Sequence, residues 1–157
     1  MAKAREVPGL HAHLPYREAA AATVNVRTQE LFDSQEGVLD TGEIERVHAM
    51  RVATRRLRAV LELYRPCFDP SRYAPVLRDV KALADALGAR RDPDVQLEAL
   101  SALAVAMPRA DLAGVDLLAD EVRREQAEGN DLLAVALAES ERSDLRGRLL
   151  ALAGEAA

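Results

Sequence analysis

Apolar residues in this 157-residue chain recur at intervals of three and four, and proline or glycine separates the periodic stretches. This spacing places apolar side chains on one face of an α-helix. No segment shows the alternation of β-branched and aromatic residues, bounded by turns, that is typical of a strand. The pattern therefore predicts an all-α protein.

Proline, glycine and capping residues set the expected limits of the helices. The expected helices cover residues 15–37, 43–65, 70–87, 93–106, 115–138 and a short stretch from 143. Gly88 is expected just beyond the end of the third helix, and Pro93 at the start of the fourth. The sequence leaves open whether the fifth helix is interrupted near Gly129 and Asn130.

The short connections between these helices favour antiparallel neighbours. We therefore expect an antiparallel, four-helix-type bundle over residues 15–157, preceded by a flexible N-terminus of residues 1–14. With only three Tyr, two Phe and no Trp, the core must be aliphatic and rich in alanine.

The second expected helix separates apolar from basic side chains. At about 100° per residue, His48, Arg51, Arg55 and Arg58 share one narrow stripe, and an apolar stripe lies on another face. Arg51 and Arg55 are a like-charge i,i+4 pair, which costs about 0.2–0.5 kcal/mol. Of these arginines, only Arg58 has an acid, Glu62, at helical spacing. The stripe therefore needs carboxylates from another helix or an anionic ligand.

Charge is segregated along the chain. The net charge is −5 and the pI is near 5.3, so the average field does not attract polyanions. Residues 46–65 nevertheless hold six arginines and one glutamate, whereas residues 111–142 hold nine acids and three arginines. Either these two segments form an internal salt-bridge interface, or the arginines form a focused polyanion site, for which the planar guanidinium fork is suited.

Several kinds of protein are disfavoured by the sequence. Cys67 has no second thiol for a disulfide, and no run approaches the roughly 20 apolar residues of a membrane span, so we expect a cytoplasmic protein. No histidine or cysteine lies at helical spacing from His48, and motifs for nucleotide loops or a nucleophile are absent. We therefore expect no catalytic residues, no metal and no cofactor. The scarcity of aromatic residues disfavours binding of single-stranded nucleic acid.

Two segments resemble the CHAD family, the conserved histidine α-helical domains. The stretch VHAMRVATRRLRAVLELYRP, residues 47–66, resembles the first family signature with its histidine and arginines. The stretch LGARRDPDVQLEAL, residues 87–100, resembles the family's L-G-x-x-R-D-x-D-V element. Lys81 matches a commonly basic position, but Ala82 replaces the tryptophan that is frequent beside it.

The resemblance implies a helical domain that binds inorganic polyphosphate along a basic channel, without catalysis and in association with polyphosphate granules. The expected polyphosphate contacts are His48, Arg51, Arg55, Arg56, Arg58, Lys81 and Arg91. Arg56 lies about 80° from His48 on the helical wheel, off the main stripe. Asp92 and Asp94 are expected to cap a helix and to orient arginines.

The resemblance also implies that the chain corresponds to the N-terminal half of a domain with two four-helix bundles. A homodimer or a second CHAD half from another chain would rebuild the full domain, and an isolated half is the alternative. Two other functions stay open: a structural or dimerisation bundle whose stripe docks on the acids of residues 111–142 in the same or a partner chain, and an enzyme acting on phosphate compounds. Duplex nucleic acid is expected to bind only weakly and without specificity.

Overall fold

A computed structural model describes residues 3–156, and between these residues it contains helices and turns but no strand, which confirms the all-α prediction. The helices are α1 (Tyr16–Asp33), α2 (Ile44–Leu63), α3 (Pro70–Ala106), α4 (Leu112–Arg142) and α5 (Leu145–Ala156), with short 3₁₀ turns at Arg65–Cys67 and Arg109–Asp111. No helix in this range combines the length and the apolar character needed to cross a bilayer.

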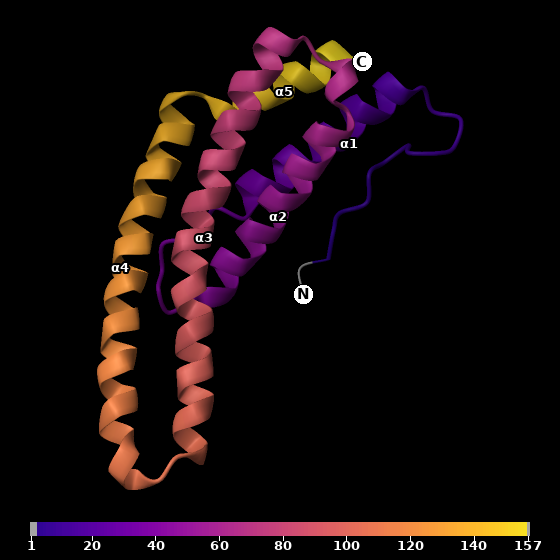
Figure 1. Cartoon of the computed structure of the whole chain (residues 1–157). Coiled ribbons are helices and arrows are strands. Elements are labelled where there is room, and N and C mark those ends of the chain that lie inside the picture. Colours follow the sequence, from indigo (N-terminus) through magenta and orange to yellow (C-terminus); the bar gives the residue numbers. More distant parts are fainter. Residues whose placement is uncertain (1–2, 157) are drawn as a thin grey trace.

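The two longest helices, α3 and α4, form an antiparallel hairpin, and α1, α2 and α5 pack beside one half of it (Figure 1). At about 1.5 Å per residue, the 37 residues of α3 extend over about 55 Å. The helices therefore pack as the predicted bundle, but the far half of the hairpin projects beyond it as a two-helix arm (Figure 1).

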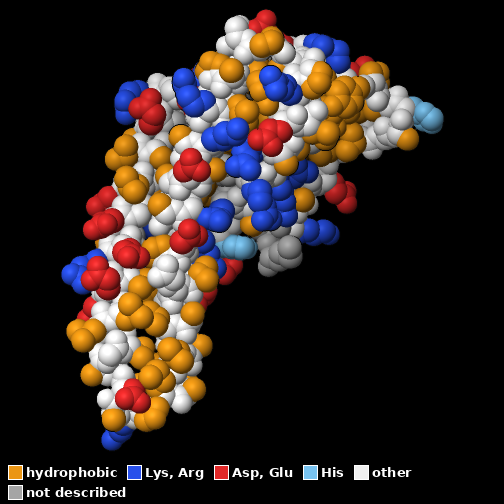
Figure 2. Space-filling view, viewed as in Figure 1, with side chains coloured by type: hydrophobic (Ala, Val, Ile, Leu, Met, Phe, Trp, Pro, Cys, Tyr) orange, Lys and Arg blue, Asp and Glu red, His pale blue; other side chains and the backbone are white. Residues whose placement is uncertain are grey.

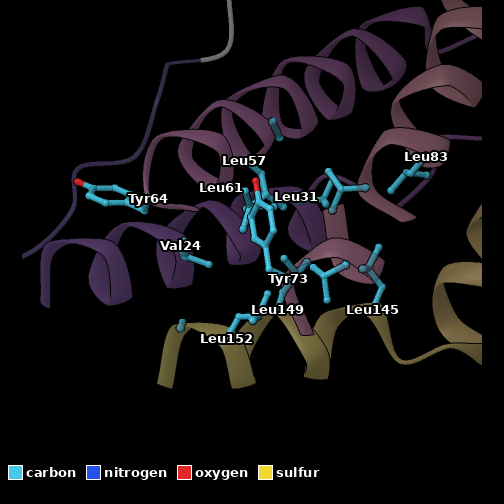
Figure 3. Close-up of a cluster of buried hydrophobic side chains, with 14 of the residues drawn as sticks. Val24, Leu31, Leu57, Leu61, Tyr64, Tyr73, Leu83, Leu145, Leu149 and Leu152 are labelled. Atoms are coloured by element: carbon cyan, nitrogen blue, oxygen red, sulfur yellow. The ribbon is translucent and has the colours of Figure 1, made fainter. Parts of the chain in front are cut away.

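The hydrophobic core lies where α1, α2, α5, the first half of α3 and the last turns of α4 meet (Figure 3). Leu57 and Leu61 of α2 are fully buried there, in the same cluster as Leu31 of α1 and Leu149 of α5. These leucines of α2 belong to the apolar stripe predicted from the sequence. Because that stripe faces the core, the basic stripe of the same helix faces outward.

The structure corrects the predicted limits of the third and fourth helices, because α3 continues through Gly88 and Pro93 without a break. Proline has no N–H, so the Ala89 carbonyl loses its helical partner at Pro93. At this point α4 packs so closely that a Cβ atom on Gly129 would lie 2.6 Å from the Ala89 oxygen. The packing of α4 holds α3 helical where the local sequence favours an end. The interruption considered at Gly129 and Asn130 does not occur either.

Gly129→Ala is expected to lower the free energy of unfolding by about 1–3 kcal/mol, because the added methyl group must push two helix backbones apart. Urea denaturation measures this loss. Gly114→Ala in the same helix is the matched control, since a Cβ atom there meets nothing within 4 Å. The control should gain about 0.5–1 kcal/mol from lower backbone entropy. Equal gains for both variants would contradict the close approach of α3 and α4.

The N-terminal segment contacts α1 through Arg5. The Arg5 carbonyl accepts a 2.6 Å hydrogen bond from Arg27, its N–H donates to Glu30, and its guanidinium lies 2.6 Å from Asp33. The predicted division of the chain into a flexible N-terminus, residues 1–14, and a bundle, residues 15–157, stays a prediction. Residues 1, 2 and 157 lie outside the described residues.

Candidate anion-binding groove

The basic stripe of α2 faces a similarly spaced stripe on α3. Within each stripe, consecutive positions are alternately three and four residues apart, and this spacing keeps the side chains of a stripe on one face of its helix. The α2 set, continued into the following turn, is Arg51, Arg55, Arg58, Glu62 and Arg65, and the α3 set is Arg78, Lys81, Asp85, Gly88 and Asp92. The helices run antiparallel, so the start of one set lies beside the end of the other. Together the two stripes border a groove on the outside of the bundle.

Near Arg51 the groove contains a hollow of about 480 Å³. Its lining consists of three arginines from α2 with small and acidic residues from α3: Arg51, Arg55, Arg58, Ala84, Asp85, Gly88, Ala89 and Asp92. A Cβ atom on Gly88 would lie 3.1 Å from Nη1 of Arg51. The small residues of α3 thus leave room for the guanidinium groups to lie against the helix.

The arginines of the stripe are only loosely paired. Nη1 of Arg51 lies 3.5 Å from the Asp92 carboxylate, and Nε of Arg58 lies 3.6 Å from Glu62. The two arginine side chains remain 46% and 44% exposed. Arg55 forms no ion pair with any residue between 3 and 156. Because exposed ion pairs contribute about 0–1 kcal/mol, an incoming anion can replace these carboxylates.

Lysine and arginine side chains gather over α2 and the adjoining part of α3, while acidic side chains follow α4 (Figure 2). Acids of α4 pair with arginines of the same helix, as in Asp120 with Arg123 at 2.6 Å and Glu139 with Arg142 at 2.7 Å. In the described part of the chain, no stripe arginine pairs with an acid from residues 111–142. This arrangement speaks against docking of the stripe on the acidic segment of the same chain.

The structure brings four of the predicted contacts to the groove. Arg51, Arg55 and Arg58 line the hollow, and Nζ of Lys81 lies 3.8 Å from the Glu62 carboxylate at the adjoining end. His48 is half-buried one helical turn before Arg51, on the same face of α2 but outside the lining of the hollow.

The other two predicted contacts lie elsewhere. Arg56 lines a small hollow beside the N-terminal segment, together with Arg5 and Lys3. Arg91 is only 13% exposed, and its guanidinium lies between Asp94, at 3.9 Å, and Glu98, at 3.6 Å. Their expected roles in anion binding stay predictions, and any such role is separate from the groove.

The capping role predicted for Asp92 and Asp94 is wrong, because both residues lie inside the continuous α3. Asp92 instead lies beside Arg51 in the groove. Asp94 is buried and forms an ion pair with buried Arg90, so its predicted role in orienting an arginine is confirmed.

Sequence reasoning did not single out Arg65, Arg78 or Asp85, although all three lie on the faces that border the groove. Arg65 lies seven residues after Arg58, so the spacing of the stripe itself could have revealed it. Within residues 3–156, no three histidine, cysteine or acidic side chains are grouped as metal ligands.

Comparison with protein families and structures adds one match. A model of the CHAD domain matches residues 22–157, a range that includes every element of the groove. Comparisons with curated proteins and with solved structures gave no match.

Proposed function

Because this chain belongs to the CHAD domain family, we propose that it binds inorganic polyphosphate in the groove between α2 and α3 and that it catalyses no reaction itself. The observation that carries the proposal is the exposed row of Arg51, Arg55 and Arg58 along a groove, on a protein whose net charge is −5. A row of like charges is unfavourable in the free protein and becomes favourable when a polyanion lies against it.

The geometry suits a flexible chain of phosphates. Successive stripe positions lie about one helical turn, or 5.4 Å, apart, so guanidinium groups can meet separate phosphates along the chain. Each guanidinium can donate two parallel hydrogen bonds to phosphate oxygens. Polyphosphate has no base edges to be read, so affinity arises from these contacts and from the release of counterions.

Isothermal titration calorimetry with long-chain polyphosphate at two salt concentrations tests the proposal. With four contacts and the slope measured for single-stranded nucleic acids, a fourfold rise in salt should lower the affinity about 50-fold. Absence of binding, or an affinity that does not change with salt, would contradict the proposal.

Two further experiments distinguish polyphosphate binding from binding of duplex DNA and from catalysis. Unlabelled polyphosphate should displace duplex DNA from the protein, while DNA should displace polyphosphate poorly. Incubation of the purified protein with triphosphate should release no inorganic phosphate, and turnover would contradict the non-catalytic part of the proposal.

The homodimer, the second CHAD half and the association with granules belong to the same proposal. The arm of α3 and α4 carries exposed apolar side chains, among them Val105 at 89% and Leu117 at 73% exposed. These side chains support contact of the arm with a second protein chain. Solution mass measured with and without polyphosphate tests the homodimer, which predicts a doubled mass. A monomer mass under both conditions would contradict it.

Gly88→Leu is expected to weaken polyphosphate binding about tenfold without loss of thermal stability. A glycine inside a helix costs about 0.5–1 kcal/mol relative to alanine, so leucine should not destabilise α3, but its side chain would fill the space beside Arg51. Calorimetry and thermal unfolding measure the two effects. Gly154→Leu is the matched control, because a Cβ atom there meets nothing within 4 Å. An unchanged affinity for Gly88→Leu would contradict the role of this space.

A further inference from the structure

A second and larger hollow adjoins the first where α2 turns into α3. Its volume is about 1170 Å³, compared with about 480 Å³ near Arg51, and Asp85 lines both hollows. The cationic side chains of the larger hollow are Arg65, Arg78 and Lys81, and its apolar wall includes Phe68. The groove therefore continues beyond the arginines that the sequence singled out.

The cations of this second hollow are accessible to a ligand. Arg65 is exposed and forms no ion pair with any described carboxylate. Arg65 also interacts electrostatically with Tyr73. Burial raises the pKa of the Tyr73 phenol, and the positive charge of Arg65 partly offsets this rise. The arginine thus lies close to the wall of the hollow.

Arg78 shares its acidic neighbour with another arginine. Nε of Arg78 lies 3.1 Å from Asp79, and Arg148 of α5 donates a 2.7 Å hydrogen bond to the same carboxylate. Burial would raise the pKa of Asp79, but the hydrogen bonds and charges of the two arginines outweigh it and hold the pKa below its ordinary value. One ionised carboxylate therefore faces two guanidinium groups, and the exposed Arg78 keeps positive charge for a ligand.

Besides Asp85, a second carboxylate lies at the boundary between the hollows. Glu62 lies 3.6 Å from Arg58 on one side and 3.8 Å from Lys81 on the other. Along both hollows the lining provides six cationic and three acidic side chains, so the whole groove is positive. A polyanion that crosses this boundary contacts cations on both sides of Glu62.

We infer that Arg65 and Arg78 extend the polyphosphate groove and make the protein favour long chains over short ones. This inference rests on the proposed function. Fourteen residues separate Arg51 from Arg65, a path of about 21 Å at the rise of a helix, so triphosphate is too short to reach from Arg51 to Arg65. A long chain occupies both hollows, and its second set of contacts forms at high effective concentration.

The experiment compares triphosphate with long-chain polyphosphate for the parent protein and for the variant Arg65→Gln with Arg78→Gln. The double variant should bind long chains about tenfold more weakly, with a salt slope lower by about 1–2. Its triphosphate affinity should change by no more than about twofold, because the hollow lined by Arg51, Arg55 and Arg58 still binds triphosphate. Arg123→Gln with Arg124→Gln is the control, because it removes the same charge from α4, outside the groove.

Each outcome separates the inference from the proposed function. Equal weakening for both chain lengths, or parent-like affinity for long chains, overturns the inference while the proposed function stands. Failure of the parent protein to bind either ligand overturns both. Circular dichroism checks the fold. Arg78→Gln alone serves as a second variant with the same expected direction of effect, because the Arg78 side chain is 75% exposed and its replacement disturbs the fold little.

Discussion

Replacing Arg51 and Arg55 together by alanine is expected to weaken long-chain polyphosphate binding at least about 100-fold. Each arginine offers charge-assisted hydrogen bonds to phosphate, worth about 1.5–3 kcal/mol per contact, and 1.4 kcal/mol corresponds to a factor of ten. Loss of Arg51 also leaves the Asp92 carboxylate in the groove without its partner, which repels the ligand. Calorimetry at low salt measures the loss.

The matched control for this variant is Arg123→Ala with Arg124→Ala. It changes the net charge by the same amount on α4, where both arginines pair with acids of their own helix. Its affinity should stay within about twofold of the parent, because only local contacts are lost. Arg51 and Arg55 are exposed, so thermal unfolding should be nearly unchanged. Tight binding by the Arg51 and Arg55 variant would refute the proposed function.

Asp94→Ala is expected to lower the free energy of unfolding by about 3–5 kcal/mol, since it leaves the charge of Arg90 buried without its partner. Both side chains are completely buried between α3 and α4. Gln126 donates a 2.6 Å hydrogen bond to Asp94, and Asn130 accepts a 3.1 Å hydrogen bond from Arg90. Urea denaturation followed by circular dichroism measures the change.

Removal of both charges is the informative control for Asp94→Ala. Arg90→Met with Asp94→Ala should recover most of the lost stability, because replacing a whole buried ion pair by apolar groups is often neutral or stabilising. Neither residue lines the groove, so the recovered protein should bind polyphosphate like the parent. A loss below about 1 kcal/mol for Asp94→Ala alone would show that water reaches Arg90.

The sequence by itself determined the nature of α2. Its amphipathic pattern depends only on the geometry of one helix, so it predicted both the leucines that face the core and the exposed row of Arg51, Arg55 and Arg58. The predicted limits, residues 43–65, also lie close to the observed Ile44–Leu63. Pro66 and the histidine and arginine motif of residues 47–66 are local signals, so α2 can be predicted from its own segment of the sequence.

Tertiary structure decided the length of α3. Gly88 and Pro93 are local signals for a helix end, but each costs at most a few kcal/mol within a helix. Packing against Gly129 and the buried pair of Arg90 and Asp94 outweighs these preferences. Gly129 packs against Ala89, and Arg90 donates a hydrogen bond to Asn130, so both contacts join residues about 40 positions apart that no local window of the sequence contains. Arg90 and Asp94 are only four residues apart, but α4 is what buries them.

Tertiary structure also decided which basic residues share a groove. Lys81 lies beside Glu62 and Asp92 lies beside Arg51 because α2 and α3 pack antiparallel in one register. Arg91 belongs to the same sequence motif as Asp92, but it lies on another face of α3, where it pairs with Asp94 three residues later and lies outside the groove. Helix periodicity determines the face on which a side chain lies, whereas the opposing residue depends on how two helices meet, and that contact is formed only when the whole bundle folds.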